Sequence, residues 1–139
     1  MKKSSFKYII FVIYIFVVLK LTIFRETTLS AREINLTLFS DLIKVYKTGT
    51  TWQFVRLFVG NIVWFVPWGF LIPMMIKKDK FVPAVLSGFA FSFLIEILQF
   101  TFKKGFFEID DLILNTMGAI IGYFLYLFAM KFKCNRNLK

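Results

Sequence analysis

The sequence predicts an all-α membrane protein with four transmembrane helices, a short interfacial helix between the first and second, and both termini in the cytoplasm. The chain of 139 residues is 58% hydrophobic and contains 20 Phe. Charged residues make up 19% and gather in clusters, which leaves long apolar runs between them. Soluble domains carry roughly a quarter charged residues. The basic clusters flank the apolar runs as they do around membrane spans, so we expect a single transmembrane domain over residues 1–139.

The placement of the charges and the cysteine content exclude some classes of partner and of metal site. The net charge is +10, but Lys residues lie beside the apolar runs. We therefore expect contacts with membrane lipids and no nucleic acid, and homo-oligomerisation stays open. The chain has no His, and its single Cys134 lies in a Lys-rich tail, which excludes a Cys/His metal site and a disulfide within one chain. We expect no metal and no cofactor, and interpret Cys134 as a bystander, with acylation beside the membrane as the alternative.

Residues 8–24 are predicted to form the first span. They are apolar except for Lys20, and a helix of this length reaches about 25 Å, enough for a short span whose Lys20 extends to the far interface. A signal peptide begins in a similar way. Here the apolar run is long and no small-residue cleavage site follows, so we expect the helix to be retained.

Residues 25–53 form the longest polar region. Hydrophobic and charged residues are mixed there, and Ser40 or Asp41 could cap a short amphipathic helix in the outer interface. An ordinary surface loop explains the same composition equally well.

Three further spans are predicted over residues 54–76, 81–102 and 111–130. The first of these contains Pro67 and Pro73, which lack the N–H that bonds to the carbonyl four residues earlier. We expect this helix to be kinked or broken against its neighbours, because freed carbonyls need partners at membrane depth. A simple proline kink without a further role is the alternative.

The basic residues predict the orientation of the spans. Ten Lys and Arg lie at the N-terminus, in the turn over residues 77–80 and in the C-terminal tail, against six in the two opposite loops. Loops rich in Lys and Arg face the cytoplasm, which places both termini there.

The predicted spans carry their few polar residues at helical spacing. Glu96 lies within the run FSFLIEILQF, where a carboxylate is costly in lipid and should face protein or water. By helix rise, Glu96 lies about 9 Å, Asn115 about 6 Å and Asn61 about 10 Å inside the outer boundary. This convergence predicts an outward-facing polar pocket. Its predicted members are Asn61, Glu96, Gln99, Lys104, Glu108, Asp110, Asp111 and Asn115.

Four of these residues also have a structural explanation. Asp110 and Asp111 can cap a helix and complement its dipole. Asn115 and Gln99 can link helices by hydrogen bonds. Residues predicted to pack or bend the helices are Pro67, Gly69, Gly88, Ser92, Gly118 and Gly122.

Three ordered motifs between residues 61 and 123 resemble a known family. They are Asn61 followed by Pro67-Trp68-Gly69, the helix pattern Ser92-x3-Glu96-x2-Gln99, and the run Glu108-Ile109-Asp110-Asp111-x3-Asn115-x2-Gly118-x3-Gly122-Tyr123. This is the VanZ-like family of small bacterial membrane proteins. The chain departs from the family pattern at Glu108, where Asp is usual, and at Gly105, where Arg is common. The neighbouring Lys104 cannot form the bidentate hydrogen bonds that an Arg makes with a carboxylate or phosphate.

The resemblance implies a multi-pass protein of the bacterial cell membrane with a role in the envelope. The founding member of the family is associated with resistance to the glycopeptide teicoplanin. The clustered polar residues include no nucleophile–base arrangement, so we expect a non-catalytic accessory whose pocket binds a lipid-linked envelope precursor, a glycopeptide-like ligand or a partner protein. The alternative is an intramembrane enzyme in which Glu96, Asp110 and Asp111 act as general base or hold Mg²⁺ or Mn²⁺. A small transporter is disfavoured because the sequence shows no internal repeat.

Overall fold

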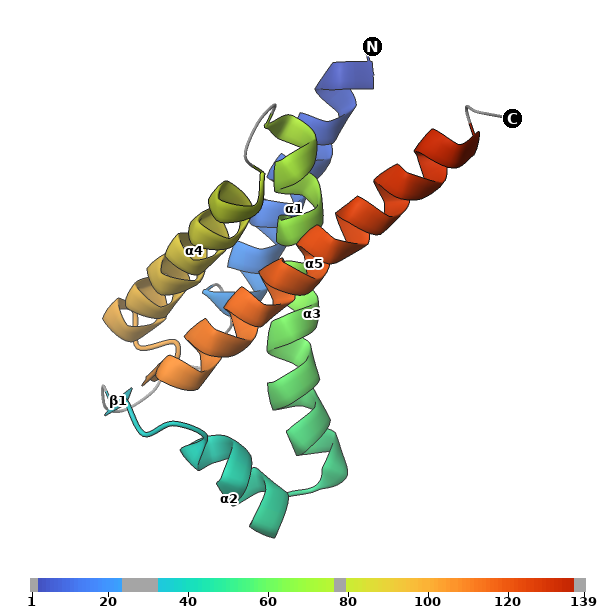
Figure 1. The fold of residues 1–139 in the computed structure, drawn as a ribbon. Coiled ribbons are helices and arrows are strands. Elements are labelled where there is room, and N and C mark those ends of the chain that lie inside the picture. The colour runs from blue at the N-terminus through green and yellow to red at the C-terminus, as the bar shows by residue number, and fades with distance from the viewer. Residues whose placement is uncertain (1–2, 24–32, 77–79, 137–139) are drawn as a thin grey trace.

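The computed structural model describes residues 3–23, 33–76 and 80–136, and within them the chain is mostly helical (Figure 1). The helices are α1 (Lys3–Thr22), α2 (Ser40–Thr48), α3 (Thr51–Met75), α4 (Phe81–Thr101) and α5 (Ile109–Arg136). Two short strands, β1 (Ile34–Asn35) and β2 (Phe107–Glu108), complete the elements. Residue 24, the first part of the predicted polar region and residues 77–79 of the predicted basic turn lie outside the described residues.

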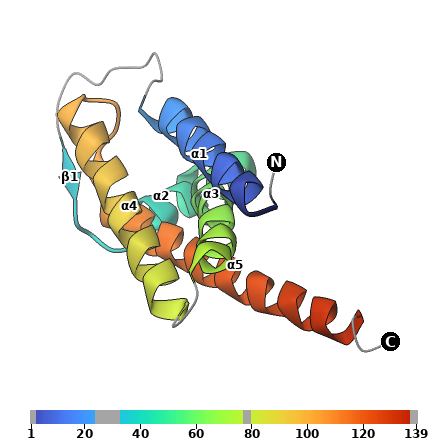
Figure 2. The same cartoon turned by 90° about the horizontal axis from the view of Figure 1, so that it is seen from above.

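Three described helices are long and apolar enough to cross a membrane: α3, α4, and α5 as far as Cys134. They begin within three residues of the predicted spans. At its far end α5 continues past the predicted end at residue 130 to Arg136. The tail residues there are good helix formers or neutral, so nothing in the sequence stops the helix where its apolar run ends. In both views this C-terminal part of α5 extends away from the other helices (Figures 1 and 2).

Helix α3 begins at a capping box that lies just before the predicted span. The Thr50 side chain accepts a hydrogen bond from the Gln53 N–H at 3.3 Å, and the Gln53 side chain accepts one from the Thr50 N–H at 2.9 Å. Two of the unpaired N–H groups at the helix start are satisfied in this way. The Thr-x-x-Gln pattern therefore explains why the helix starts earlier than its apolar run.

We expected α3 to be kinked or broken at its prolines, and the break is wrong. The helix runs without interruption from Thr51 to Met75 through Pro67 and Pro73. Each proline removes only one N–H donor, and the remaining hydrogen bonds of the helix carry it across both positions. A neighbouring helix supports this region, because the Tyr14 hydroxyl of α1 donates to the Trp64 carbonyl at 2.6 Å.

Helices α3 and α5 cross so closely that no side chain fits between their backbones. A Cβ atom on Gly69 would lie 1.8 Å from the carbonyl oxygen of Ala119, and one on Gly118 would lie 2.2 Å from that of Ile62. Gly122 makes a similar approach one turn further along α5. Without a hydrophobic driving force between helices in lipid, such close packing stabilises helix pairs.

An aromatic core joins α1 and α4 to this crossing. Trp68 of α3 stacks on Phe91 of α4, with ring centroids 4.4 Å apart, and its indole N–H donates to the Ser87 hydroxyl at 3.0 Å. Val18 of α1 is fully buried in the same cluster. A Cβ atom on Gly88 would lie 3.2 Å from the Trp68 ring, so the glycine leaves room for the indole.

The polar region after α1 contains a strand pairing that the sequence pattern did not predict. Strands β1 and β2 pair in parallel, with Ile34 opposite Phe107, and join this region to the connection between α4 and α5. Helix α2 lies where a helix or a loop was expected, but the predicted cap at Ser40 or Asp41 is wrong. The N-cap residue is Phe39, in the left-handed region at φ 58°, and it makes no side-chain capping bond. The Ser40 hydroxyl instead accepts a hydrogen bond from the Asn35 amide at 2.8 Å.

The crossing of α3 and α5 can be tested with two matched substitutions in α3. Gly69→Ala is expected to destabilise the protein by about 1–3 kcal/mol, because the added methyl group meets the Ala119 backbone. Gly60→Ala is the control, since its Cβ has no neighbour within 4 Å. It should be neutral or stabilise by up to about 1 kcal/mol through helix propensity. Thermal unfolding in detergent measures both, and equal midpoints for the two variants would contradict the packing described.

Candidate functional site

Side-chain hydrogen bonds connect α3, α4 and α5 near the end of the helices where β1, β2 and α2 lie, which we call the loop end. Asn61 of α3 donates to a carboxylate oxygen of Asp111, in the first turn of α5. Four residues further along α5, Asn115 donates to the Ser92 hydroxyl of α4 at 2.8 Å. Ser92 and Asn115 are both buried. The polar residues that share helix faces in the sequence therefore meet across helices in the fold.

Glu96 is the most deeply buried carboxylate among the described residues, with 1% of its surface exposed. Its carboxylate accepts a hydrogen bond from the backbone N–H of Glu108 in β2 at 3.0 Å. A buried carboxylate needs such donors, because burying an unpartnered charge is strongly unfavourable. Glu96 thus holds the connection between α4 and α5 against α4.

Asp110 likewise holds the start of α2 in place by a hydrogen bond to its carboxylate. One carboxylate oxygen accepts the backbone N–H of Phe39 at 2.7 Å, and the residue is 5% exposed. The other oxygen is buried and has no hydrogen-bond partner among the described residues. Since Phe39 adopts the left-handed conformation, this bond stabilises a backbone geometry that non-glycine residues rarely adopt.

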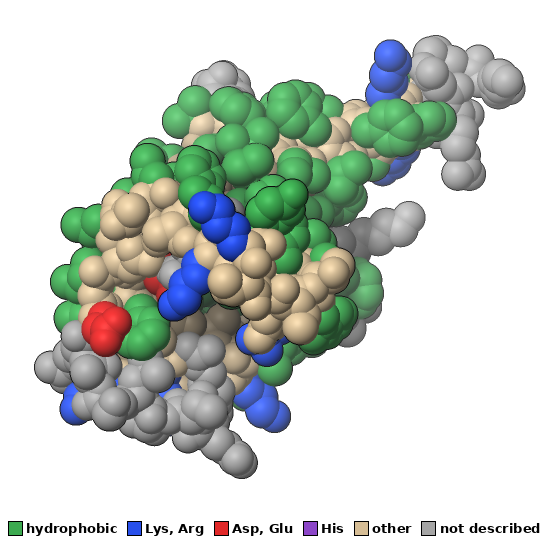
Figure 3. Space-filling view, turned by 90° about the horizontal axis from the view of Figure 1, so that it is seen from below, with side chains coloured by type: hydrophobic (Ala, Val, Ile, Leu, Met, Phe, Trp, Pro, Cys, Tyr) green, Lys and Arg blue, Asp and Glu red, His purple; other side chains and the backbone are tan. Residues whose placement is uncertain are grey.

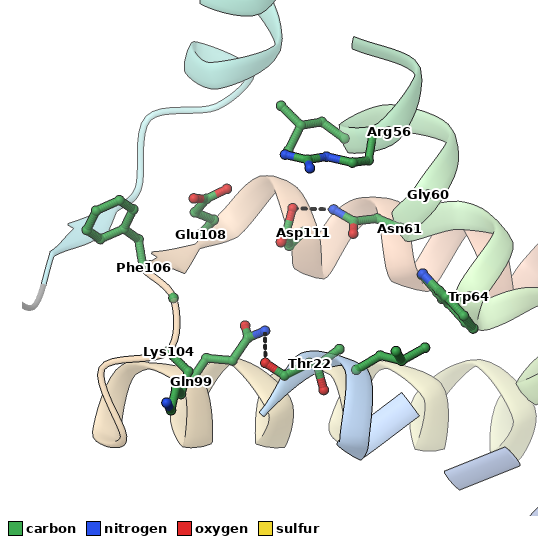
Figure 4. Close-up of a pocket in the computed structure, with 13 residues that line it drawn as sticks. Thr22, Arg56, Gly60, Asn61, Trp64, Gln99, Lys104, Phe106, Glu108 and Asp111 are labelled. Atoms are coloured by element: carbon green, nitrogen blue, oxygen red, sulfur yellow. Dashed lines mark hydrogen bonds between the residues drawn. The ribbon is translucent and has the colours of Figure 1, made fainter. Parts of the chain in front are cut away.

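A cavity of about 540 Å³ lies between these elements at the loop end. This volume is within the range of about 300–1,000 Å³ typical of small-molecule sites. The residues that line it are Leu21, Thr22, Arg56, Leu57, Gly60, Asn61, Trp64, Gln99, Lys104, Gly105, Phe106, Glu108 and Asp111. Figure 4 shows Arg56 on one side of the row formed by Glu108 and Asp111, with Lys104 and Gln99 on the other. Seen from below, this face is hollowed, and Lys and Arg side chains lie around the hollow (Figure 3).

A second cavity of about 40 Å³ shares part of this lining. It shares Thr22, Asn61, Trp64, Gln99 and Asp111 with the larger cavity. The smaller cavity extends the polar lining toward the aromatic core.

The predicted pocket residues fall into three places. Asn61, Gln99, Lys104, Glu108 and Asp111 line the larger cavity. Glu96 and Asn115 line only the smaller one. Asp110 lines neither and contacts the start of α2 instead. Pro67 and the predicted packing glycines lie in the helices behind the cavity, around the crossing of α3 and α5.

Sequence reasoning missed one wall of the cavity and one charged group. The end of α1 contributes Leu21 and Thr22, and the Thr22 carbonyl accepts a hydrogen bond from Gln99 at 3.3 Å. Arg56 also lines the cavity, although it was not among the predicted members. Arg56, Gly60 and Trp64 are spaced by four residues, so they share a helix face, and that spacing is the signal that could have identified them.

The carboxylates of the site hold other elements of the fold in place through hydrogen bonds. Glu96, Asp110 and Asp111 accept hydrogen bonds from β2, from the start of α2 and from α3, respectively. Within the described part of the chain, no group of three or more His, Cys, Asp or Glu residues is placed to hold a metal ion. The chemistry that this arrangement supports directly is recognition by hydrogen bonds and charge inside a cavity with apolar walls.

Comparison with known proteins identifies relatives by sequence. The family model described as VanZ/LLP1 matches residues 8–130. Protein VanZ from Enterococcus faecium is 35% identical over 71 residues, which are 51% of this chain and 44% of that protein. The matched region thus spans less than half the length of this relative. No solved structure matches the chain.

The contact between Asp110 and α2 predicts how a substitution changes local stability. Asp110→Ala removes the acceptor of the Phe39 N–H, and hydrogen bonds to charged groups contribute about 1.5–3 kcal/mol. Amide exchange over residues 37–43 should therefore become roughly tenfold faster or more. Asp110→Asn keeps an oxygen acceptor and should retain part of the protection. Hydrogen–deuterium exchange measured by mass spectrometry tests this, and unchanged protection in Asp110→Ala would show that α2 is held by other contacts.

Proposed function

The chain belongs to the VanZ/LLP1 family, as its motifs predicted, and on this premise we propose that it is a multi-pass protein of the bacterial cytoplasmic membrane. In this proposal its loop end faces outward and its cavity binds or organises an envelope component. The observation that carries the proposal is the cavity itself, because four polar residues of the family motifs line it: Asn61, Gln99, Glu108 and Asp111.

We assign α1 as a fourth span beside α3, α4 and α5, with both termini in the cytoplasm. The excess of basic residues at the termini supports this orientation. The arrangement of the helices agrees with it, since the first turns of α1 and the last turns of α5 lie at the end opposite α2 and β1 (Figure 1).

Helix α2 is assigned to the outer interface. Its exposed side chains include Ile43 and Tyr46, and Trp52 at the start of α3 is 71% exposed. Lys44 and Lys47 are exposed on the same short helix. Aromatic rings and Lys stems together are typical of the boundary between lipid tails and headgroups.

The single cysteine allows a direct test of this orientation. Cys134 is exposed at the end of α5, so a membrane-impermeant maleimide should label it only after the cells are permeabilised. Tyr46 is 78% exposed, and Tyr46→Cys in a Cys134→Ser background should be labelled in intact cells. Labelling of Cys134 from outside would reverse the proposed topology.

The proposed effect of the cavity is on glycopeptide susceptibility. The family resemblance supports teicoplanin as the compound to test, and a lipid-linked envelope precursor or the glycopeptide itself as the ligand class. Since less than half of the Enterococcus faecium protein is matched, the function of that whole protein is transferred here only as a proposal. A binding role agrees with the carboxylates, which accept hydrogen bonds from other elements of the fold.

A substitution that fills the cavity tests this function. Gly60 lines the cavity, and a side chain there meets no atom within 4 Å of its Cβ, so Gly60→Leu should occupy the cavity while the fold is kept. In a strain lacking the gene, wild type should restore the teicoplanin susceptibility profile and the envelope lipid inventory, and Gly60→Leu should not. Glu96→Gln and Asp111→Asn are expected to fail as well.

Val59→Leu provides the matched control for this experiment. Val59 precedes Gly60, is 43% exposed and does not line the cavity, so its variant should complement like wild type. Equal amounts of each protein in the membrane fraction exclude a folding defect. Full complementation by Gly60→Leu would show that the cavity is not the functional site.

The second candidate is an intramembrane enzyme acting on lipid-linked precursors. Its supporting observation is that two carboxylates, Glu108 and Asp111, line one cavity, where they could act as a general base or bind a divalent cation. An accumulated precursor in the deletion strain, together with Mg²⁺ or Mn²⁺ binding that is lost in Asp111→Asn, would favour the enzyme. Full activity of Asp111→Asn without metal binding would exclude it.

A further inference from the structure

Among the described residues that line the larger cavity, the charged side chains are balanced in sign. Arg56 and Lys104 supply two positive charges, and Glu108 and Asp111 supply two negative charges. An anion alone would meet both carboxylates, and a cation alone would meet both basic groups. A ligand with one group of each sign complements the cavity better, because complementary charges favour the correct partner and like charges exclude the wrong one.

The two acidic side chains lie between the two basic ones (Figure 4). Figure 4 shows Arg56 and Lys104 on opposite sides of the row that Glu108 and Asp111 form. Arg56 makes no hydrogen bond or ion pair with another described residue, and its guanidinium group lies at the cavity. A guanidinium group binds phosphate through two parallel N–H bonds, whereas carboxylates accept the N–H groups of an ammonium.

One wall of the cavity is apolar. Leu21 of α1 and Leu57 and Trp64 of α3 line it, and Trp64 is 43% exposed. Gly60 lies between these α3 residues on the helix face and leaves space beside it. Leu21 is 53% exposed and Val63 of α3 is 56% exposed, so a hydrocarbon chain that leaves the cavity here would meet further apolar side chains.

We propose that the cavity binds a lipid headgroup that carries both a phosphate and a primary amine. The phosphate is held by Arg56, the ammonium group is held by the neighbouring Glu108 and Asp111, and the lipid chain leaves past Trp64. This rests on the proposed function, and it assigns the chemical class of the ligand for the same cavity.

Binding of defined lipids to the purified protein tests the assignment. The probes are phosphatidylethanolamine, phosphatidylglycerol, which lacks the amine, and phosphatidylcholine, whose quaternary amine has no N–H donor. Free phosphoethanolamine is the headgroup without lipid chains, and it tests how much the chains contribute to binding. Titration in detergent, followed by native mass spectrometry and by the thermal unfolding midpoint, should rank phosphatidylethanolamine first and free phosphoethanolamine well below it.

Single substitutions test which residues contact the phosphate and which contact the amine. Arg56→Gln should weaken phosphatidylethanolamine and phosphatidylglycerol alike by roughly tenfold, because it removes a charge-assisted contact to phosphate. Glu108→Gln should weaken only phosphatidylethanolamine and so remove its advantage over phosphatidylglycerol. Gly60→Leu should abolish binding of both lipids, and Val59→Leu should leave both unchanged.

Each outcome separates this inference from the proposed function. Equal affinity for phosphatidylethanolamine and phosphatidylglycerol in the wild type would overturn the role of the amine. Unchanged affinity in Arg56→Gln would overturn the role of the phosphate contact. If no lipid binds selectively but Gly60→Leu still fails to complement, the cavity is functional and the ligand class is wrong.

Discussion

The contact between the backbones of α3 and α5 determines most of this structure. At Gly69 and Gly118 the two helices approach so closely that a single methyl group would overlap a carbonyl oxygen. Such a contact allows one register and one crossing point, since any shift along either helix brings a larger side chain into the gap. The register places Asn61 beside Asp111, two helical turns from Gly118, and so positions the first turn of α5 against α3.

The first turn of α5 then organises the loop end. Asp111 accepts a hydrogen bond from Asn61 of α3, and Asp110 accepts one from the backbone N–H of Phe39 at the start of α2. Glu96 of α4 accepts a hydrogen bond from the backbone N–H of Glu108, just before α5. Buried carboxylates are unfavourable in an apolar environment unless they accept such bonds. These hydrogen bonds therefore hold α3, the start of α2 and β2 in place around the carboxylates. The larger cavity is the space that these elements enclose together with the end of α1.

Much of the fold and part of the site follow from local sequence patterns. Apolar runs predicted the positions of α3, α4 and α5 within a few residues at their starts, because the length of an apolar helix is a property of its own segment. Helical spacing placed Glu96 and Asn115 on faces that contact other helices. The same reasoning misplaced the cap of α2 and allowed a break in α3 that does not occur, because it considered Ser40 and Pro67 without their neighbours in the fold.

By itself, the sequence determined a helical membrane protein of the VanZ/LLP1 family with polar residues aligned along its helices. Only the tertiary structure decided which partners those residues have. Asp110 and Phe39 are 71 positions apart, and α1 closes the cavity from the far end of the chain. Arg56 joins the site because α3 packs against α5, and Arg56, Glu108 and Asp111 then line the same cavity. Periodicity is local, whereas a cavity depends on how distant segments pack.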